Sequence, residues 1–142
     1  MTRDSASGEM GRRDLFSIEI AFKHPTSDPQ SITELLSIQP MYCWRAGDRF
    51  ANIVKPSTYW YGRLSSGSTE TEFANSLEHL ADFLAKNEAF FHGFKDVKGE
   101  AEVVLNHRVE LMEGKVFELR LGAILVAQLA DAGIGVRVQG WS

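Results

Sequence analysis

Three stretches of the chain alternate between apolar and polar residues, and this alternation restricts the possible folds more than any other feature. They are residues 15–22, 101–111 and 134–141. Successive side chains of a strand point to opposite faces of a sheet, so each stretch predicts a strand with one buried face. Strands of a parallel sheet that is covered on both faces read as continuous apolar runs instead. The alternation therefore predicts a largely antiparallel sheet with helices packed on one face.

Three other stretches have the apolar spacing of helices. Asp28 and Pro29 have the residue types of an N-cap and a first helical position. Thr69 and Glu72 have the spacing of a capping box, and Gly133 follows the third helix as a terminator. The apolar residues that we expect to be buried on the three helices are Ile32, Leu35 and Leu36, then Phe73, Leu77, Leu80, Ala81 and Leu84, and last Leu121, Ile124, Leu125, Leu129 and Ala132.

Two aromatic-rich stretches, residues 41–50 and 58–66, predict two more strands joined by a loop. The elements then follow one another as β-α-β-β-α-β-α-β. We expect an α+β fold, ferredoxin-like, with a mainly antiparallel sheet and one additional helix. Residues 1–13 are polar and small and predict a flexible N-terminal tail, so residues 14–142 form a single domain.

Charge and cysteine content argue against several classes of function. Lys and Arg number 15 and Asp and Glu 19, a net charge of −4. This balance disfavours a broad phosphate-binding surface, so we expect no nucleic-acid partner. The single cysteine, Cys43, can form neither an intrachain disulfide nor a cysteine-based zinc cluster. No stretch resembles a secretory signal or a membrane span, so we expect a cytoplasmic protein with no membrane partner.

Four short segments occur in a recognisable order. The segment "ITELLSIQP" is followed by "WRAGD", then by "YWYGRLSS" and, near the C-terminal end, by "LADAGIGVRV". In this the chain resembles the bacterial domain-of-unknown-function family 4279 over nearly its whole length beyond the tail, most specifically in "WRAGD" and Trp60. The family has no established activity, so the resemblance implies an architecture and not a reaction. Its last strand often carries an acidic residue where this chain has Arg137 and Gln139, so no role for such an acid is carried over.

The segment "WRAGDR" allows two interpretations. In the first it is an anion or carboxylate site, in which Arg45 or Arg49 supplies a planar donor fork and Asp48 orients it. In the second a strand ends in a turn, where Gly47 takes an unusual backbone angle, Asp48 bonds backbone donors, and Arg45 lies across the indole of Trp44. The structural interpretation is favoured because Asp and Gly are ordinary turn residues.

Two further residues could carry chemistry. Cys43 would be a nucleophile if a positive neighbour such as Arg45 lowered its pKa, but a lone strand cysteine is more often a small buried hydrophobe. His107 falls on the apolar face of its strand, where a core histidine with satisfied hydrogen bonds is the commoner case. The four histidines have no zinc-type spacing and no cofactor motif is present, so we expect neither metal nor cofactor.

The polar sides of the alternating strands predict a surface of mixed charge. If the first, fourth and last of the strands are neighbours, Glu19, Arg108, Glu110, Arg137 and Gln139 point away from the helices together. Such a face is either simply solvated or binds a partner.

The function that these patterns favour is a small, non-enzymatic protein-binding module, of which a toxin-neutralising immunity-type protein is one version. The alternative is a small-anion or carboxylate binding module built on Arg45, Asp48 and Arg49. Enzymatic activity through Cys43 or His107 is the weakest interpretation. Trp60 is expected to be largely buried in its aromatic strand. The candidate binding residues are Trp44, Arg45, Asp48, Arg49, Trp60, His107, Arg108 and Arg137.

Overall fold

The computed structural model describes residues 14–108 and 120–141, with the side chain of Trp141 left out. The predicted tail at residues 1–13 and the end of the predicted strand at 109–111, with Glu110, lie outside the described residues. The elements are β1 (Phe16–His24), α1 (Pro29–Leu36), β2 (Pro40–Trp44), β3 (Arg49–Phe50), β4 (Ile53–Val54), β5 (Thr58–Gly67), α2 (Glu70–Lys86), α3 (Glu88–Asp96), β6 (Glu100–Arg108), α4 (Ala123–Ala132) and β7 (Ile134–Trp141).

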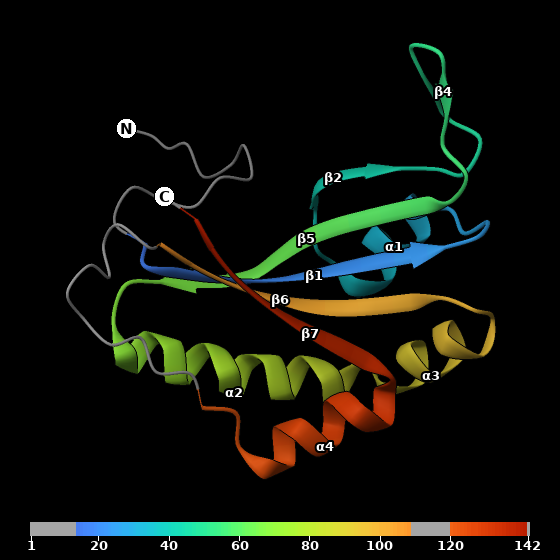
Figure 1. Ribbon diagram of the computed structural model, residues 1–142. Helices are drawn as coiled ribbons and strands as arrows, with labels where there is room; N and C mark the ends of the chain where they lie inside the picture. Colours follow the sequence, from blue (N-terminus) through green and yellow to red (C-terminus); the bar gives the residue numbers. More distant parts are fainter. Residues whose placement is uncertain (1–13, 109–119, 142) are drawn as a thin grey trace.

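Five strands form one sheet in the order β2-β5-β1-β6-β7, and β3 and β4 form a separate two-stranded hairpin. Neighbours in the large sheet are antiparallel except β6 and β7, which are parallel. Figure 1 shows that α4 carries the chain back beneath the sheet between these last two strands. The predicted mixed α+β class and the mainly antiparallel sheet are confirmed.

The main core lies between the sheet and the helices. The inward residues of β1 are Phe16, Ile18, Ile20 and Phe22, each at most 3% exposed. They belong to one cluster with buried residues of all four helices, so the helices cover the same face of the sheet. Burying each large apolar side chain contributes about 1.5–3 kcal/mol, and this cluster is therefore the principal source of stability.

Trp60 is fully buried in this core, as expected. Its ring centroid lies 5.5 Å from that of Phe22, and its indole Nε1 donates a hydrogen bond of 2.9 Å to Thr33 Oγ1 on α1. The side chain has no surface left for a ligand. Its place among the candidate binding residues is therefore corrected to a packing role that joins β5 to α1.

The helix ends agree with the sequence signals. The Asp28 side chain accepts from Gln30 N, Thr69 and Glu72 form a complete capping box, and Gly133 ends α4 in the left-handed conformation with φ 71°. These signals are local, because each cap bonds backbone groups only a few residues away.

Some boundaries and buried positions differ from expectation. The strand predicted at residues 41–50 ends at Trp44, because a turn follows and Arg49–Phe50 joins the small hairpin instead. Leu35 and Ile124 are exposed by 56% and 79%, since each lies at the margin of its helix's apolar stripe. Val136 and Val138 pair with the buried Val103 and Leu105 and share their side of the sheet, as the alternation predicts, but they are exposed by 41% and 48% on β7, an edge strand.

Among the helices of the described residues, none combines the length and the hydrophobicity that a bilayer crossing needs.

Candidate functional site

The face of the sheet opposite the helices is the candidate site, and we call it the open face. The outward residues of β1, β5 and β6 lie on it, with the outward residues of β2 and β7 at its two edges. Ala21, Tyr61 and Val104 form a second, small apolar cluster there, with Met41 and Tyr59 packed against it. This cluster contains no helical residue among those described, so the open face has a core of its own made by strands.

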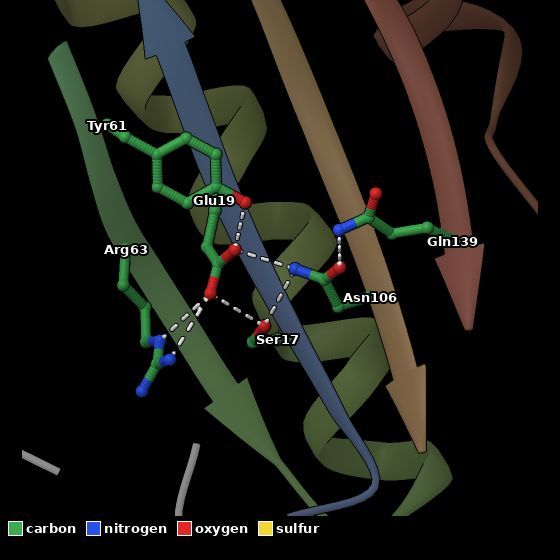
Figure 2. Close-up of polar contacts among 6 residues, drawn as sticks. All are labelled: Ser17, Glu19, Tyr61, Arg63, Asn106 and Gln139. Atoms are coloured by element: carbon green, nitrogen blue, oxygen red, sulfur yellow. Dashed lines mark hydrogen bonds and ion pairs between the residues drawn. The ribbon is translucent and has the colours of Figure 1, made fainter. Parts of the chain in front are cut away.

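A buried carboxylate lies at the centre of the open face (Figure 2). Glu19 is 3% exposed. Its Oε2 accepts from Ser17 Oγ at 3.0 Å and from Arg63 Nη2 at 3.2 Å. Its Oε1 accepts from Asn106 Nδ2 at 2.6 Å and from the Tyr61 hydroxyl. A buried charge is tolerated when it is paired and hydrogen-bonded, and this one has donors on β1, β5 and β6.

The polar contacts continue onto β7. Asn106 Oδ1 accepts from Gln139 Nε2 at 2.6 Å, and Arg137 Nε lies 3.0 Å from Glu102 Oε1. The first, fourth and last of the predicted strands, which are β1, β6 and β7, are therefore neighbours. This was the condition under which the sequence predicts a mixed-charge surface. We call Ser17, Glu19, Tyr61, Arg63, Asn106 and Gln139 the Glu19 network.

Four stacked rings occupy the β2–β5 side of the open face, and we call them the aromatic row: Tyr42, Trp44, Tyr59 and Tyr61. Tyr42 stacks on Tyr61 with centroids 5.0 Å apart and an interplanar angle of 6°. Trp44 stacks on Tyr59 at 5.0 Å and 24°. Lys55 Nζ lies 4.2 Å from the Trp44 ring centroid, close enough for a cation–π interaction. Tyr42 is 48% exposed, so the row ends at the surface.

Burial raises the pKa values of three groups on β2 and β5. Burial, reinforced by Tyr42, raises the pKa of Tyr59 to about 12. Burial and the hydrogen bond to Glu19 raise the pKa of Tyr61 further above its ordinary value. Burial, with Asp48 and Asp28, also raises the pKa of the Cys43 thiol. At neutral pH the two phenols are therefore hydrogen-bond donors, and Cys43 is a thiol and not the thiolate that a nucleophile requires.

A hollow of about 410 Å³ adjoins the aromatic row at the end of the sheet. Tyr59 lines it together with the charged residues Lys23, Glu100 and Glu102, and Gly135 of β7 lies beside them. Charges of both signs around an open hollow suit a polar side chain of a partner better than an apolar cofactor.

The "WRAGDR" segment forms the turn of the structural interpretation. Asp48 Oδ2 accepts from Arg45 N at 2.8 Å, Asp48 N donates to Arg45 O at 3.0 Å, and Gly47 has φ 95°. The Arg45 guanidinium lies 2.8 Å from Asp28 Oδ2. The expected stacking of Arg45 on Trp44 is therefore wrong, and Lys55 lies over that indole instead.

The remaining candidate residues fall in separate places. Arg137 lies on the open face in its ion pair, and the alternation of β6 puts half-buried Arg108 on the same face. His107 is half-buried on the helix side of β6, next along that side to Leu105. Arg49 is exposed on the β3–β4 hairpin. The structure thus brings Trp44, Arg108 and Arg137 to one face and leaves His107 away from it.

The residues that dominate the open face are not among the candidates predicted from the sequence. Glu19 was expected on a mixed-charge surface that is either solvated or bound by a partner, whereas the structure buries it. Tyr42, Tyr59 and Tyr61 were not singled out. Their spacing was the available signal, because aromatic residues two apart on each of two predicted strands share one face.

One exposed cluster on the helix layer has metal-ligand chemistry. Ligand atoms of Glu88, His92 and Asp131 lie within 4.8 Å of one another, and His92 Nε2 is 3.0 Å from Asp131 Oδ2. A hydrogen bond between His92 and Asp131 beside a second carboxylate accounts for this arrangement, so we assign no metal to it.

Comparison with known proteins gives one match. The model of the family described as "Domain of unknown function (DUF4279)" matches residues 14–142. No curated protein and no solved structure matches the chain.

Proposed function

The chain belongs to the DUF4279 family of domains of unknown function, and we propose that it is a protein-binding module whose partner docks on the open face. The aromatic row carries this proposal. It places stacked aromatic side chains on the face of the sheet that the described helices leave uncovered, with Tyr42 exposed and Trp44 and Tyr59 half-buried. Tyr and Trp are enriched at protein interfaces because they bury a large apolar area and still offer a polar atom.

The Glu19 network supports the same proposal. Ser17, Tyr61, Arg63 and Asn106 all donate to the Glu19 carboxylate, so the side chains beside the aromatic row are fixed before a partner arrives. A preorganised surface loses less conformational entropy on binding than a mobile one. The surface around it, with the Arg137–Glu102 ion pair and the neighbouring hollow, offers the polar rim that protein interfaces have.

The stacking favours a protein over a nucleic acid as the partner. Tyr42 and Tyr61, like Trp44 and Tyr59, already cover one ring face of each other, so a base inserted between them would have to separate each pair. The net charge of −4 also opposes phosphate contacts.

We infer that the sheet is a ferredoxin-like unit extended by α4 and β7. The support is the order β2-β5-β1-β6 with antiparallel neighbours, in which α1 connects β1 to β2 while α2 and α3 connect β5 to β6. On this plan α4 and β7 add a fifth strand beside β6, which widens the open face.

A toxin-neutralising immunity-type protein is one version of the proposal. Its support is the small size of the chain and its mild acidity, which suits a basic partner. Identification of the bound protein distinguishes this version from other binding modules.

The test compares two surface variants. Tyr42→Ala removes an exposed ring of the aromatic row, and Ile124→Ala removes a 79% exposed side chain from the helix layer as the control. Proteins from the cells that make this chain are captured on wild type and on each variant, after equal thermal stability has been established. A protein that binds wild type and Ile124→Ala is then purified and titrated.

The expected result is that Tyr42→Ala weakens binding of that purified protein at least about tenfold, as loss of an interface hot spot does. Equal affinity for both variants, or no protein that distinguishes them, would overturn the proposal.

A further inference from the structure

The β3–β4 hairpin is a second surface that the aromatic row does not account for. Its strands are paired as Arg49 with Val54 and Phe50 with Ile53. Phe50, Ile53 and Val54 are exposed by 50%, 63% and 49%. In Figure 1 the hairpin, labelled at β4, projects beyond the end of the sheet. Large apolar side chains grouped on a projection mark an interaction site more strongly than the same residues scattered singly.

The base of the hairpin is held in place. Gly47 N donates to Lys55 O and Lys55 N donates to Asp48 O, both at 2.8 Å. These bonds continue the antiparallel pairing below the two short strands, so the tip projects from a fixed base. Ala51, at the tip, adopts φ 53°, a conformation that an L-residue rarely takes outside a tight turn.

The hairpin is also continuous with the aromatic row. The ring centroids of Trp44 and Phe50 lie 6.4 Å apart, and Lys55 Nζ is within 5.3 Å of the Phe50 centroid as well as over Trp44. A partner on the open face can therefore reach the tip without leaving the aromatic surface.

The charge around the tip is opposite to that of the chain. Residues 45–55 hold three basic residues and one acidic residue, a net charge of +2, whereas the whole chain carries −4. Arg45 is paired with Asp28, and Arg49 is exposed beside the apolar tip. The complementary surface is an apolar pocket with carboxylates at its rim.

We propose that the β3–β4 hairpin inserts Phe50 and Ile53 into an apolar, acid-rimmed pocket of a partner protein. The inference rests on the proposed function, since that partner is the protein bound by the open face. The pocket would cover the apolar tip while its carboxylates meet Arg49.

The experiment places a photo-crosslinking amino acid at Ile53, at Tyr42 or, as a control, at Ile124 of the full chain, in the cells that make it. One protein crosslinked from both Ile53 and Tyr42, and not from Ile124, is expected. Its crosslinked peptide from Ile53 should contain apolar residues flanked by Asp or Glu. That protein is then purified and titrated with Ile53→Ser, Arg49→Glu and Ile124→Ser.

We expect Ile53→Ser to weaken binding at least about tenfold and Ile124→Ser less than about twofold. Arg49→Glu should weaken binding and reduce its dependence on salt. Capture from Tyr42 alone would overturn the hairpin inference and leave the open face intact, whereas capture from Ile53 alone would overturn the open face. Capture from neither site would overturn both.

A membrane is the other surface that combines an apolar interior with negative charge. The probe is a vesicle containing phosphatidylcholine and phosphatidylserine, to which wild type is expected not to bind. Sedimentation of wild type with these vesicles, abolished by Ile53→Ser, would overturn the proposal in favour of lipid insertion.

Discussion

The ring of Trp60 packs so closely against Gly62, two residues along β5, that no Cβ fits there. A Cβ added at Gly62 would lie 2.5 Å from Cη2 of the Trp60 ring, closer than real Cβ contacts. We expect Gly62→Ala to destabilise the fold by about 1–3 kcal/mol, the usual range for overpacking, as measured by urea unfolding.

The control for this prediction is a double-mutant cycle. Trp60→Ala alone should cost about 3–5 kcal/mol, because it empties a buried indole site and leaves Thr33 Oγ1 without its donor. Adding Gly62→Ala to Trp60→Ala should then cost almost nothing, since the clash is gone. Additive losses would contradict the contact.

Glu19 is the second residue with a measurable consequence. Glu19→Gln removes the charge that Arg63 faces and puts an amide donor among the donors of Ser17 and Tyr61. Removing one partner of a buried ion pair costs about 3–5 kcal/mol, and we expect a loss of that size in urea unfolding. Glu102→Gln is the matched control and should cost less than about 1 kcal/mol, because its ion pair is 40% exposed on the carboxylate side. Similar losses for the two variants would show that the Glu19 network is not the buried unit described.

At the scale of elements, the turn after β2 separates the two interpretations of "WRAGDR". Asp48→Ala removes the acceptor of Arg45 N and should lower stability by about 0.5–2 kcal/mol, as loss of a cap does. Arg45→Met removes only the exposed pair with Asp28 and should cost less than about 1 kcal/mol. Thermal unfolding measures both.

The same unfolding, repeated with a panel of phosphates and carboxylates, tests the anion site. A ligand at a hundred times its dissociation constant would add about 2.7 kcal/mol to the stability of wild type. We expect no such increase. An increase confined to wild type and absent from both variants would restore the anion-binding interpretation.

The capping box at the start of α2 makes part of the stability depend on pH. Hydrogen bonds from the backbone of Ser68, and from Thr69, lower the pKa of Glu72 below its ordinary value. The folded protein therefore binds this proton less readily than the unfolded chain. These hydrogen bonds therefore contribute to folding stability above the ordinary pKa of a glutamate. That contribution is lost as the pH falls through the pKa of Glu72 in the folded protein.

Glu72→Gln should make the stability of the protein less dependent on pH in the acid range. The melting temperature, followed from neutral pH down to acid, should decline less steeply for Glu72→Gln than for wild type. Identical slopes would mean that the carboxylate makes no such bonds in solution. Glu78→Gln, on an exposed position of the same helix, is the control.

Elements with local signals could be predicted, and the site could not. The caps at Asp28 and Thr69 depend on bonds within four residues, so their residue types were sufficient. The burial of Glu19 depends on Arg63 and Asn106, which come from other strands. Alternation alone put Glu19 on the face away from the helices, because the pattern indicates which side a residue faces and not what covers that side.

For the whole molecule, the order of the strands predicts that their backbone amides are unequally protected from hydrogen exchange. β1 is paired on both edges and has eight of nine residues buried, whereas β7 is paired on one edge and has exposed valines. Amide hydrogen exchange measures this difference. We expect the slowest exchange in β1, near the global unfolding free energy, and faster exchange in β7 and in the β3–β4 hairpin. Equal protection in β1 and β7 would contradict the position of β7 as an edge.

The central position of β1 in the sheet determines when the sheet can be completed during biosynthesis. β1 is translated before both of its partners, and β6 begins only at Glu100. At about 5–20 residues per second, the ribosome needs about 4 to 15 seconds to reach β6 after it completes β1. During that interval one edge of an apolar strand has no partner within the chain. Nascent chains stalled before β6 should therefore bind chaperones and aggregate, and completion of the sheet follows the emergence of residues 100–108.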